Sequence, residues 1–101
     1  MVYHTNMRAT LIRHEKVTDE LGNTVEIKLW RIPVSSDKPH GFKYSLVYIV
    51  SGQRVIGYDN GEGKGDHRHY LDREEPYGFH SLRQLADDFL ADVENFKRRE
   101  R

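Results

Sequence analysis

The sequence reads FKYSLVYIV from Phe42 to Val50, and this stretch decides the fold. Large side chains recur at every second position, which is the period of a β-strand. The positions between them include Val47 and Ile49, so the end of the stretch is apolar on both faces. A strand covered on both faces belongs in the middle of a sheet. We therefore expect Phe42–Val50 to be the central strand.

Two β-hairpins are predicted around this strand. Residues 51–53 (SGQ) form a turn into a second strand over 54–58, which makes one hairpin. Upstream, residues 8–17 and 24–30 show the same alternation on either side of the polar turn DELGN, which makes another. The segment that joins the two hairpins contains two prolines, and proline cannot continue a central strand.

The last patterned segment predicts an amphipathic helix over residues 81–97. Ser81 followed by Gln84 is a capping-box pattern. Apolar side chains then recur at spacings of three and four, which places them on one stripe: Leu82, Leu85, Ala86, Phe89, Leu90, Val93 and Phe96. The fold class expected is α+β, an antiparallel sheet of two hairpins with this C-terminal helix packed on one face, in the order β-β-β-β-α. Residues 1–7 are expected to be a loose leader, and residues 8–101 a single domain.

Composition limits both the core and the classes of site. Hydrophobic residues make up 37% of the 101 residues and six of them are tyrosines, so a small, tyrosine-rich core is expected. Such a core favours a partner or a second copy, and a homodimer is possible. The absence of cysteine excludes disulfides and thiolate chemistry. No apolar run approaches the roughly 20 residues of a membrane span, and we expect a cytoplasmic protein. Sixteen basic residues balance sixteen acidic ones, so any nucleic-acid site must be local.

Residues 59–80 are expected to be a long functional loop, because the strand pattern stops there. Within it, His67 and His69 are two residues apart, which places both imidazoles on one side of an extended chain. One histidine that accepts a proton and another that donates one are what cleavage of RNA by its own 2′-hydroxyl requires. Asp66 or Glu75 is the candidate to orient an imidazole, and Glu75 could itself act as a base. The first hypothesis is therefore a metal-independent ribonuclease.

The same segment offers candidates for binding RNA. The cations that could hold phosphate are Lys64, Arg68 and Arg73, with glycines around Lys64 that allow close approach of the backbone. Tyr58 and Tyr70 could stack on single-stranded bases.

Two other interpretations of the segment stay open. Asp59, Asp66, His67 and His69 are nitrogen and oxygen ligands suited to a divalent metal ion, which would make a metal-dependent nuclease. Clustered charges and glycines are also typical of a solvated loop without chemistry. In that case the chain is a non-catalytic module that binds a partner protein or nucleic acid.

Five stretches of the chain together resemble the TumE family of bacterial and archaeal toxin-antitoxin proteins. They read IKLWRIP (27–33), FKYSL (42–46), RVIGYDN (54–60), GKGDHRH (63–69) and EPY (75–77). The resemblance implies a small cytoplasmic toxin that is neutralised by an antitoxin with a helix-turn-helix DNA-binding domain. It does not assign catalytic residues. The prediction of a ribonuclease therefore depends on residues 59–80 and on the analogy with other small toxins, most of which cut RNA.

Overall fold

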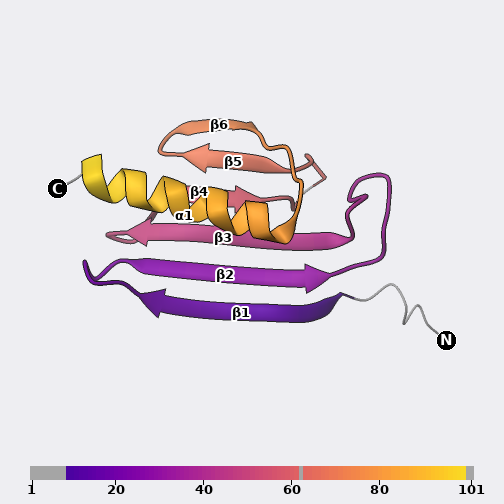
Figure 1. Cartoon of the computed structure of the whole chain (residues 1–101), viewed down its shortest axis with the longest axis horizontal. Coiled ribbons are helices and arrows are strands. Elements are labelled where there is room, and N and C mark those ends of the chain that lie inside the picture. The colour runs from indigo at the N-terminus through magenta and orange to yellow at the C-terminus, as the bar shows by residue number, and fades with distance from the viewer. Residues whose placement is uncertain (1–8, 62, 100–101) are drawn as a thin grey trace.

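The computed structural model describes residues 9–61 and 63–99. These residues form a six-stranded antiparallel sheet, in which the strands lie side by side in sequence order, and one helix (Figure 1). The elements are β1 (Thr10–Thr18), β2 (Thr24–Arg31), β3 (Phe42–Val50), β4 (Gln53–Asp59), β5 (His67–Tyr70), β6 (Arg73–Pro76) and α1 (Leu82–Arg99). The predicted leader lies outside the described residues. Within the described ranges, no helix combines the length and the apolar composition that crossing a membrane requires.

The α+β class, both predicted hairpins and the C-terminal helix are confirmed, but the sheet has six strands rather than four. The two additional strands, β5 and β6, lie within the segment that the sequence analysis assigned to a loop. Their turn is made by Leu71 and Asp72, and Leu71 has a φ of 57°. Hairpin turns with positive φ usually carry glycine or asparagine, so a leucine there gives no turn signal. The expectation of an irregular loop over 59–80 is therefore wrong.

The hydrophobic core lies between α1 and one face of β3 and β4. Its buried side chains come from alternate positions of the two strands and from one stripe of the helix: Tyr44, Leu46, Tyr48, Ile56, Tyr58, Leu85, Phe89, Val93 and Phe96. Three of these nine side chains are tyrosines, in agreement with the core expected from composition. β3 lies in the middle of the sheet, as predicted, since two strands lie on one side of it and three on the other. The expectation that both of its faces are covered is wrong, because only alternate residues of the strand are buried.

Asn60 holds the end of β4 against β3. Its side chain is fully buried, at 0% exposure. The amide Oδ1 accepts a hydrogen bond from the backbone N–H of Tyr44, and Nδ2 donates to the carbonyl of Phe42. A side chain therefore extends the ladder beyond the last residue of β4. Because Asn60 directly follows Asp59, these bonds also fix the backbone next to the candidate site.

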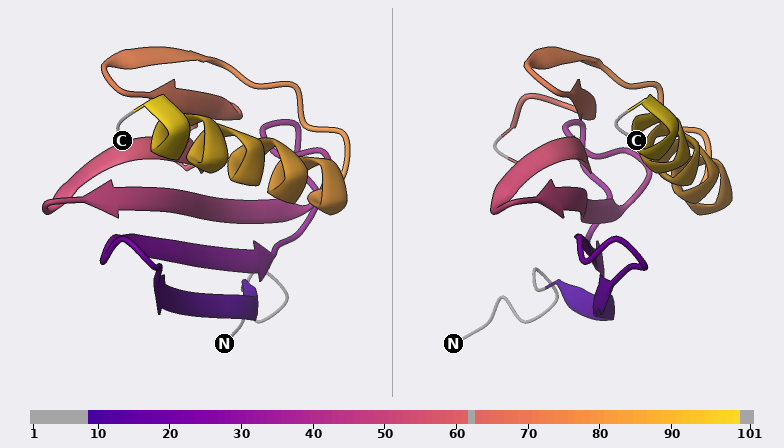
Figure 2. Two further views of the ribbon diagram at one scale, coloured as in Figure 1. Left: turned by 60° about the vertical axis from the view of Figure 1, so that its left-hand side comes forward. Right: turned by 90° about the vertical axis from the view of Figure 1, so that its left-hand side faces the viewer.

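The helix covers one face of the sheet and leaves the other face without a second layer (Figure 2). The register defines what the open face carries, since residues paired directly across strands point to the same side. One row of paired residues crosses this face from β1 to β5: His14, Lys28, Ser45, Asp59 and His67. In the neighbouring row, Gly57 on β4 pairs with His69, and His69 pairs with Glu74 on β6. Polar and charged side chains thus meet on the face opposite the core.

Candidate functional site

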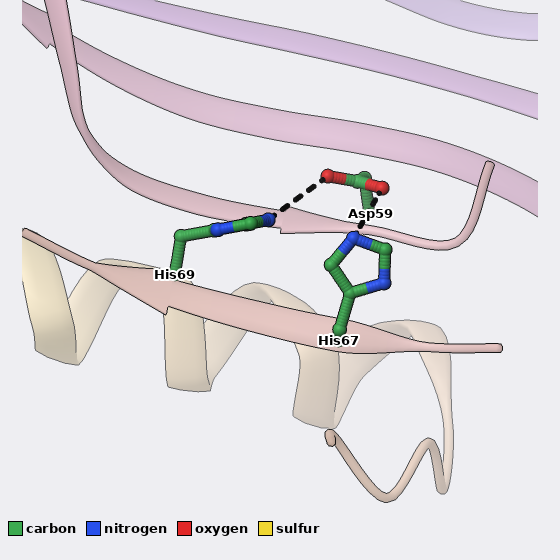
Figure 3. A group of neighbouring side chains, drawn as sticks. All are labelled: Asp59, His67 and His69. Atoms are coloured by element: carbon green, nitrogen blue, oxygen red, sulfur yellow. Dashed lines mark ion pairs between the residues drawn. The ribbon is translucent and has the colours of Figure 1, made fainter. Parts of the chain in front are cut away.

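Asp59, His67 and His69 form the centre of a candidate site on the open face. Asp59 is the last residue of β4, and the two histidines come from β5, the strand next to it. Figure 3 shows both imidazoles directed at the Asp59 carboxylate. The two rings meet edge to face, with centroids 5.0 Å apart. The prediction that His67 and His69 share one side of the chain is confirmed by this arrangement, although the chain there is a strand.

His67 has hydrogen-bond acceptors at both ring nitrogens. Nδ1 lies 3.0 Å from the carbonyl oxygen of Gly65, and Nε2 lies 3.0 Å from Oδ1 of Asp59. The contact with Gly65 is a hydrogen bond in which Nδ1–H donates, because a carbonyl oxygen only accepts. The contact with Asp59 is an ion pair when the ring is protonated. The side chain is 8% exposed, and Glu74 Oε2 lies a further 3.6 Å from Nε2. His67 thus lies between a carbonyl oxygen and the two carboxylates of Asp59 and Glu74.

His69 has the opposite environment. Its Nδ1 lies 3.2 Å from Nη2 of Arg54, and a guanidinium only donates. Nδ1 is therefore the acceptor, and the proton of the neutral ring is on Nε2, which faces Asp59 at 3.7 Å and Glu74 at 3.8 Å. Burial and the positive charge of Arg54 lower the pKa of His69, against the opposing effect of Glu74 and Asp59. His69 is thus the imidazole whose neutral form its surroundings favour.

Gly57 allows Arg54 to reach His69. A Cβ atom at Gly57 would lie 2.9 Å from Cδ of Arg54, which is closer than real Cβ contacts. The arginine side chain therefore lies over the position where residue 57 has no side chain. Gly57 pairs with His69 in the sheet, so an arginine side chain that crosses Gly57 ends beside the imidazole of His69.

Replacing Arg54 with methionine is expected to raise the pKa of His69, because the variant removes a positive charge that disfavours the imidazolium. The measurement is an NMR titration of the histidine ring protons. Arg31→Met is the matched control: it removes an exposed arginine that lies over the Phe42 ring, away from His69. A pKa of His69 that is unchanged or lower in Arg54→Met would contradict this account of the site.

The three central residues line a hollow of about 370 Å³. Four basic side chains line it too: Lys28, Lys43, Arg54 and Lys64. The acidic lining residues are Asp59 and Glu74, both of which contact the histidines. Lys64 Nζ lies 3.8 Å from Glu74 Oε2, which places this predicted phosphate ligand at the rim. The hollow therefore combines proton-transfer groups with a surplus of positive charge.

Arg68, which the sequence analysis placed with the phosphate ligands, lies on the other face of β5. Its guanidinium makes two hydrogen bonds to the carboxylate of Asp92 on α1, at 2.7 and 2.9 Å. A third bond joins it to Glu75 at 2.8 Å. The bonds to Asp92 raise the pKa of Arg68, against its burial. Arg68 fastens the β5–β6 hairpin to the helix, and Glu75 belongs to that contact rather than to the histidine site.

The two tyrosines expected to stack on bases also face the helix. Tyr58 is buried in the core, and its hydroxyl donates to Asp92 at 2.6 Å. Burial is the main reason that the pKa of Tyr58 is raised, and the bond to Asp92 adds to it. Tyr70 accepts a hydrogen bond from Asn95 and lies beneath the guanidinium of Arg68. Neither ring lines the hollow.

Arg73, a further predicted phosphate ligand, is highly exposed on β6. Its Nη2 atom lies 3.9 Å from Oε1 of Glu75.

Among the described residues, Asp66 pairs with a different histidine, His40, and not with His67 or His69. Its Oδ2 lies 3.0 Å from Nε2 of His40 and accepts a hydrogen bond of 2.7 Å from the Tyr44 hydroxyl. Burial and the neighbouring Asp66 raise the pKa of Tyr44. The His40 ring packs 4.1 Å from that of Phe79, between centroids. This cluster holds the backbone that precedes His67, and the carboxylates near the two imidazoles are those of Asp59 and Glu74.

No sequence pattern predicts a role in the site for Arg54, or places Lys28, Trp30 and Lys43 beside the histidines. Residues 74–77 were expected only to offer a carboxylate near an imidazole, and Glu74 is the residue of that stretch that lies there. All five line the hollow. A signal for Lys28 and Trp30 was present, because they alternate with the apolar residues of their strand and so face away from the core. Lys28 and Trp30 lie near residues 67–69 because of the order of the strands in the sheet. The alternation of residues within one strand does not predict that order.

A metal ion is the other group that this site could hold. Asp59, His67 and His69 each offer one ligand atom, and these atoms lie within 4.8 Å of one another. Two imidazoles and a carboxylate suit a transition metal. Asp66, the fourth ligand suggested by the sequence, is engaged with His40 and Tyr44. The contact of Arg54 with His69 opposes coordination through Nε2, because a metal there needs the proton on Nδ1.

The fold and the hollow define a small α+β protein with two histidines and a carboxylate on the open face of its sheet. The chain belongs to the TumE toxin family, because the family model described as Toxin TumE matches residues 3–97. The resemblance seen in the sequence is thereby confirmed. No curated protein and no solved structure gives a significant match to the chain.

Proposed function

We propose that this toxin is a metal-independent ribonuclease whose active site is the hollow around Asp59, His67 and His69. The observation that carries the proposal is the contrast between the two imidazoles. His67 faces acceptors at both nitrogens, whereas His69 accepts a hydrogen bond from Arg54 and has a lowered pKa. One proton donor and one neutral imidazole, 5.0 Å apart between centroids, are the pair that acid-base catalysis needs near neutral pH.

In this mechanism His69 is the base and His67 is the acid. Arg54 turns from His69 to the scissile phosphate, which frees Nδ1 to take the proton of the 2′-hydroxyl. The 2′-oxygen forms a bond to phosphorus while the bond to the 5′-oxygen breaks, and the leaving oxygen takes a proton from His67. The products are a 2′,3′-cyclic phosphate and a 5′-hydroxyl. Arg54 stabilises the negative charge that develops on the phosphate oxygens.

Asp59 and Glu74 support the two imidazoles. Asp59 holds Nε2 of His67 at 3.0 Å and faces Nε2 of His69 at 3.7 Å, so it orients both rings. Glu74 lies within 3.8 Å of both Nε2 atoms. A carboxylate close to an imidazolium stabilises the charged ring that forms when the base takes its proton. These residues replace Asp66 and Glu75 in the mechanism expected from the sequence.

The test is cleavage of single-stranded RNA by the purified protein in the presence of EDTA. We expect cleavage to persist, with 2′,3′-cyclic phosphate and 5′-hydroxyl ends, which can be mapped by end-specific ligation. Cleavage that is lost in EDTA and restored by a divalent ion would instead select the metal-dependent nuclease, for which the convergence of Asp59, His67 and His69 is the favouring observation. Binding of RNA or of the antitoxin without any turnover would select the non-catalytic module.

The toxin family indicates an antitoxin partner for this chain. That the antitoxin carries a helix-turn-helix domain, that the toxin acts in the cytoplasm and that it forms a homodimer remain predictions from the sequence. The cheapest check of the first is to read the adjacent open reading frame for a short helix-turn-helix protein.

A further inference from the structure

Trp30 is the single tryptophan of the chain, and it lies outside the core. On β2 it alternates with Leu29, which packs against the core, so the indole is on the open face. Its cross-strand partner on β3 is Lys43, whose Nζ lies over the indole ring, 5.4 Å from the ring centroid. A half-buried indole between charged side chains presents an aromatic surface on a face that is otherwise mainly polar.

The indole shares the hollow with the two histidines. β2 and β5 are three strand spacings apart, which is about 14 Å at the usual separation of neighbouring strands. That separation is too large for Trp30 to touch the reacting phosphate, but it is within reach of a neighbouring part of the same polynucleotide. Trp30 is therefore placed to bind substrate and not to take part in the chemistry.

Basic side chains occupy the space between the indole and the histidines. Lys28 is in the same cross-strand row as Asp59 and His67, and the ammonium of Lys43 lies over the indole ring. Lys43 therefore moves from the ring to a phosphate when a base stacks there. Contacts of lysines with phosphate favour any nucleic acid and do not distinguish a single strand from a duplex. An aromatic ring distinguishes them, because only an unpaired, unstacked base can lie flat against it.

We propose that Trp30 stacks on an unpaired base of the RNA, so that the substrate class of this site is single-stranded RNA. Lys28 and Lys43 hold the phosphates between the stacked base and the scissile bond. The inference rests on the proposed function, since it takes RNA as the ligand. The role of stacking on a base, predicted for Tyr58 and Tyr70, is assigned here to Trp30. The two tyrosine rings face the helix, whereas Trp30 lines the hollow.

The direct test uses the fluorescence of Trp30, which reports on this one position. The probe is a single-stranded 2′-O-methyl oligoribonucleotide, which lacks the attacking hydroxyl and so binds without being cut. Two further probes are the same strand annealed to its complement and a strand of equal length with abasic sites. We expect saturable quenching by the single strand and little quenching by the duplex or the abasic strand, even where these bind through their phosphates.

Two variants extend the test to affinity, measured by the anisotropy of a labelled strand. Trp30→Leu keeps apolar bulk and loses the ring, and should weaken binding of the single strand by about tenfold or more. Trp30→Phe keeps a smaller ring and should restore part of that loss. Both variants should bind the abasic strand as the wild type does, which shows that they are folded.

Several outcomes would overturn the inference. Equal quenching by single strand and duplex, or no quenching by a strand whose RNA form is cleaved, would remove the stacking role while leaving the ribonuclease intact. Unchanged RNA binding by Trp30→Leu together with lost neutralisation by the antitoxin would assign Trp30 to a protein interface. Quenching by the single strand in a protein that cuts no RNA would support the stacking and refute the proposed catalysis.

Discussion

Alanine at His67 or at His69 is expected to lower the rate of RNA cleavage by about 10²- to 10⁴-fold, the usual contribution of a positioned acid or base. Removal of His67 takes away the proton donor, and removal of His69 takes away the neutral imidazole. Expression of either variant should no longer arrest growth. The measurements are single-turnover cleavage of a labelled RNA and the growth of cells after induction.

The matched control is His14→Ala. His14 belongs to the same cross-strand row but lies at its far end, exposed and paired with Glu26 at 3.0 Å. The His14→Ala variant should therefore cleave RNA as the wild type does. Because His67 is buried, His67→Gln provides a second variant that keeps hydrogen-bonding groups in its place. Growth arrest that persists unchanged in the alanine variants at both His67 and His69 would refute this mechanism.

Loss of Arg68 is expected to destabilise the protein and not simply to weaken RNA binding. The guanidinium is bonded to Asp92 and Glu75, and the side chains of Arg68 and Asp92 are 24% and 15% exposed. Arg68→Met leaves the partly buried Asp92 carboxylate without a cation, with the Tyr58 hydroxyl as its remaining donor. For a pair that is only partly buried, we expect a loss of about 2–3 kcal/mol in the free energy of unfolding. In a domain of this size the melting temperature falls by about 10–20 °C.

Thermal and urea unfolding, followed by circular dichroism, measure this loss. Arg73→Met is the control, because its side chain is 76% exposed and its pairing with Glu75 spans 3.9 Å. Its free energy of unfolding should change by less than about 0.5 kcal/mol. Wild-type stability in Arg68→Met combined with weak RNA binding would return Arg68 to the phosphate role that the sequence suggested.

The sequence predicted the elements with clear periodicity and missed those without it. The alternation in Phe42–Val50 and the stripe in residues 81–97 both arise from burial against the core, which is why they are visible in one dimension. β5 and β6 are only four residues long and consist mainly of charged or polar residues. They are stabilised by pairing with β4 and by the contact of Arg68 with Asp92, neither of which leaves a hydrophobic pattern.

The residues of the candidate site also fall into those that the sequence could identify and those that it could not. His67 and His69 were identifiable because they are close in sequence and their spacing puts them on one side of the chain. Arg68 was assigned to them by proximity in sequence, whereas the alternation of a strand turns it to the opposite face. Arg54 comes from another strand and crosses Gly57 to reach His69, so it could be found only once the register was known.

The contact between Arg68 and α1 also bears on the order in which the parts of the fold can form during synthesis. The histidines belong to β5, and the β5–β6 hairpin is fastened to a helix that the ribosome makes after it. A nascent chain that has completed β6 but not α1 lacks both the core partners of β3 and β4 and the carboxylate that receives Arg68. The hairpin that carries His67 and His69 is thus fixed in place only after α1 has been synthesised.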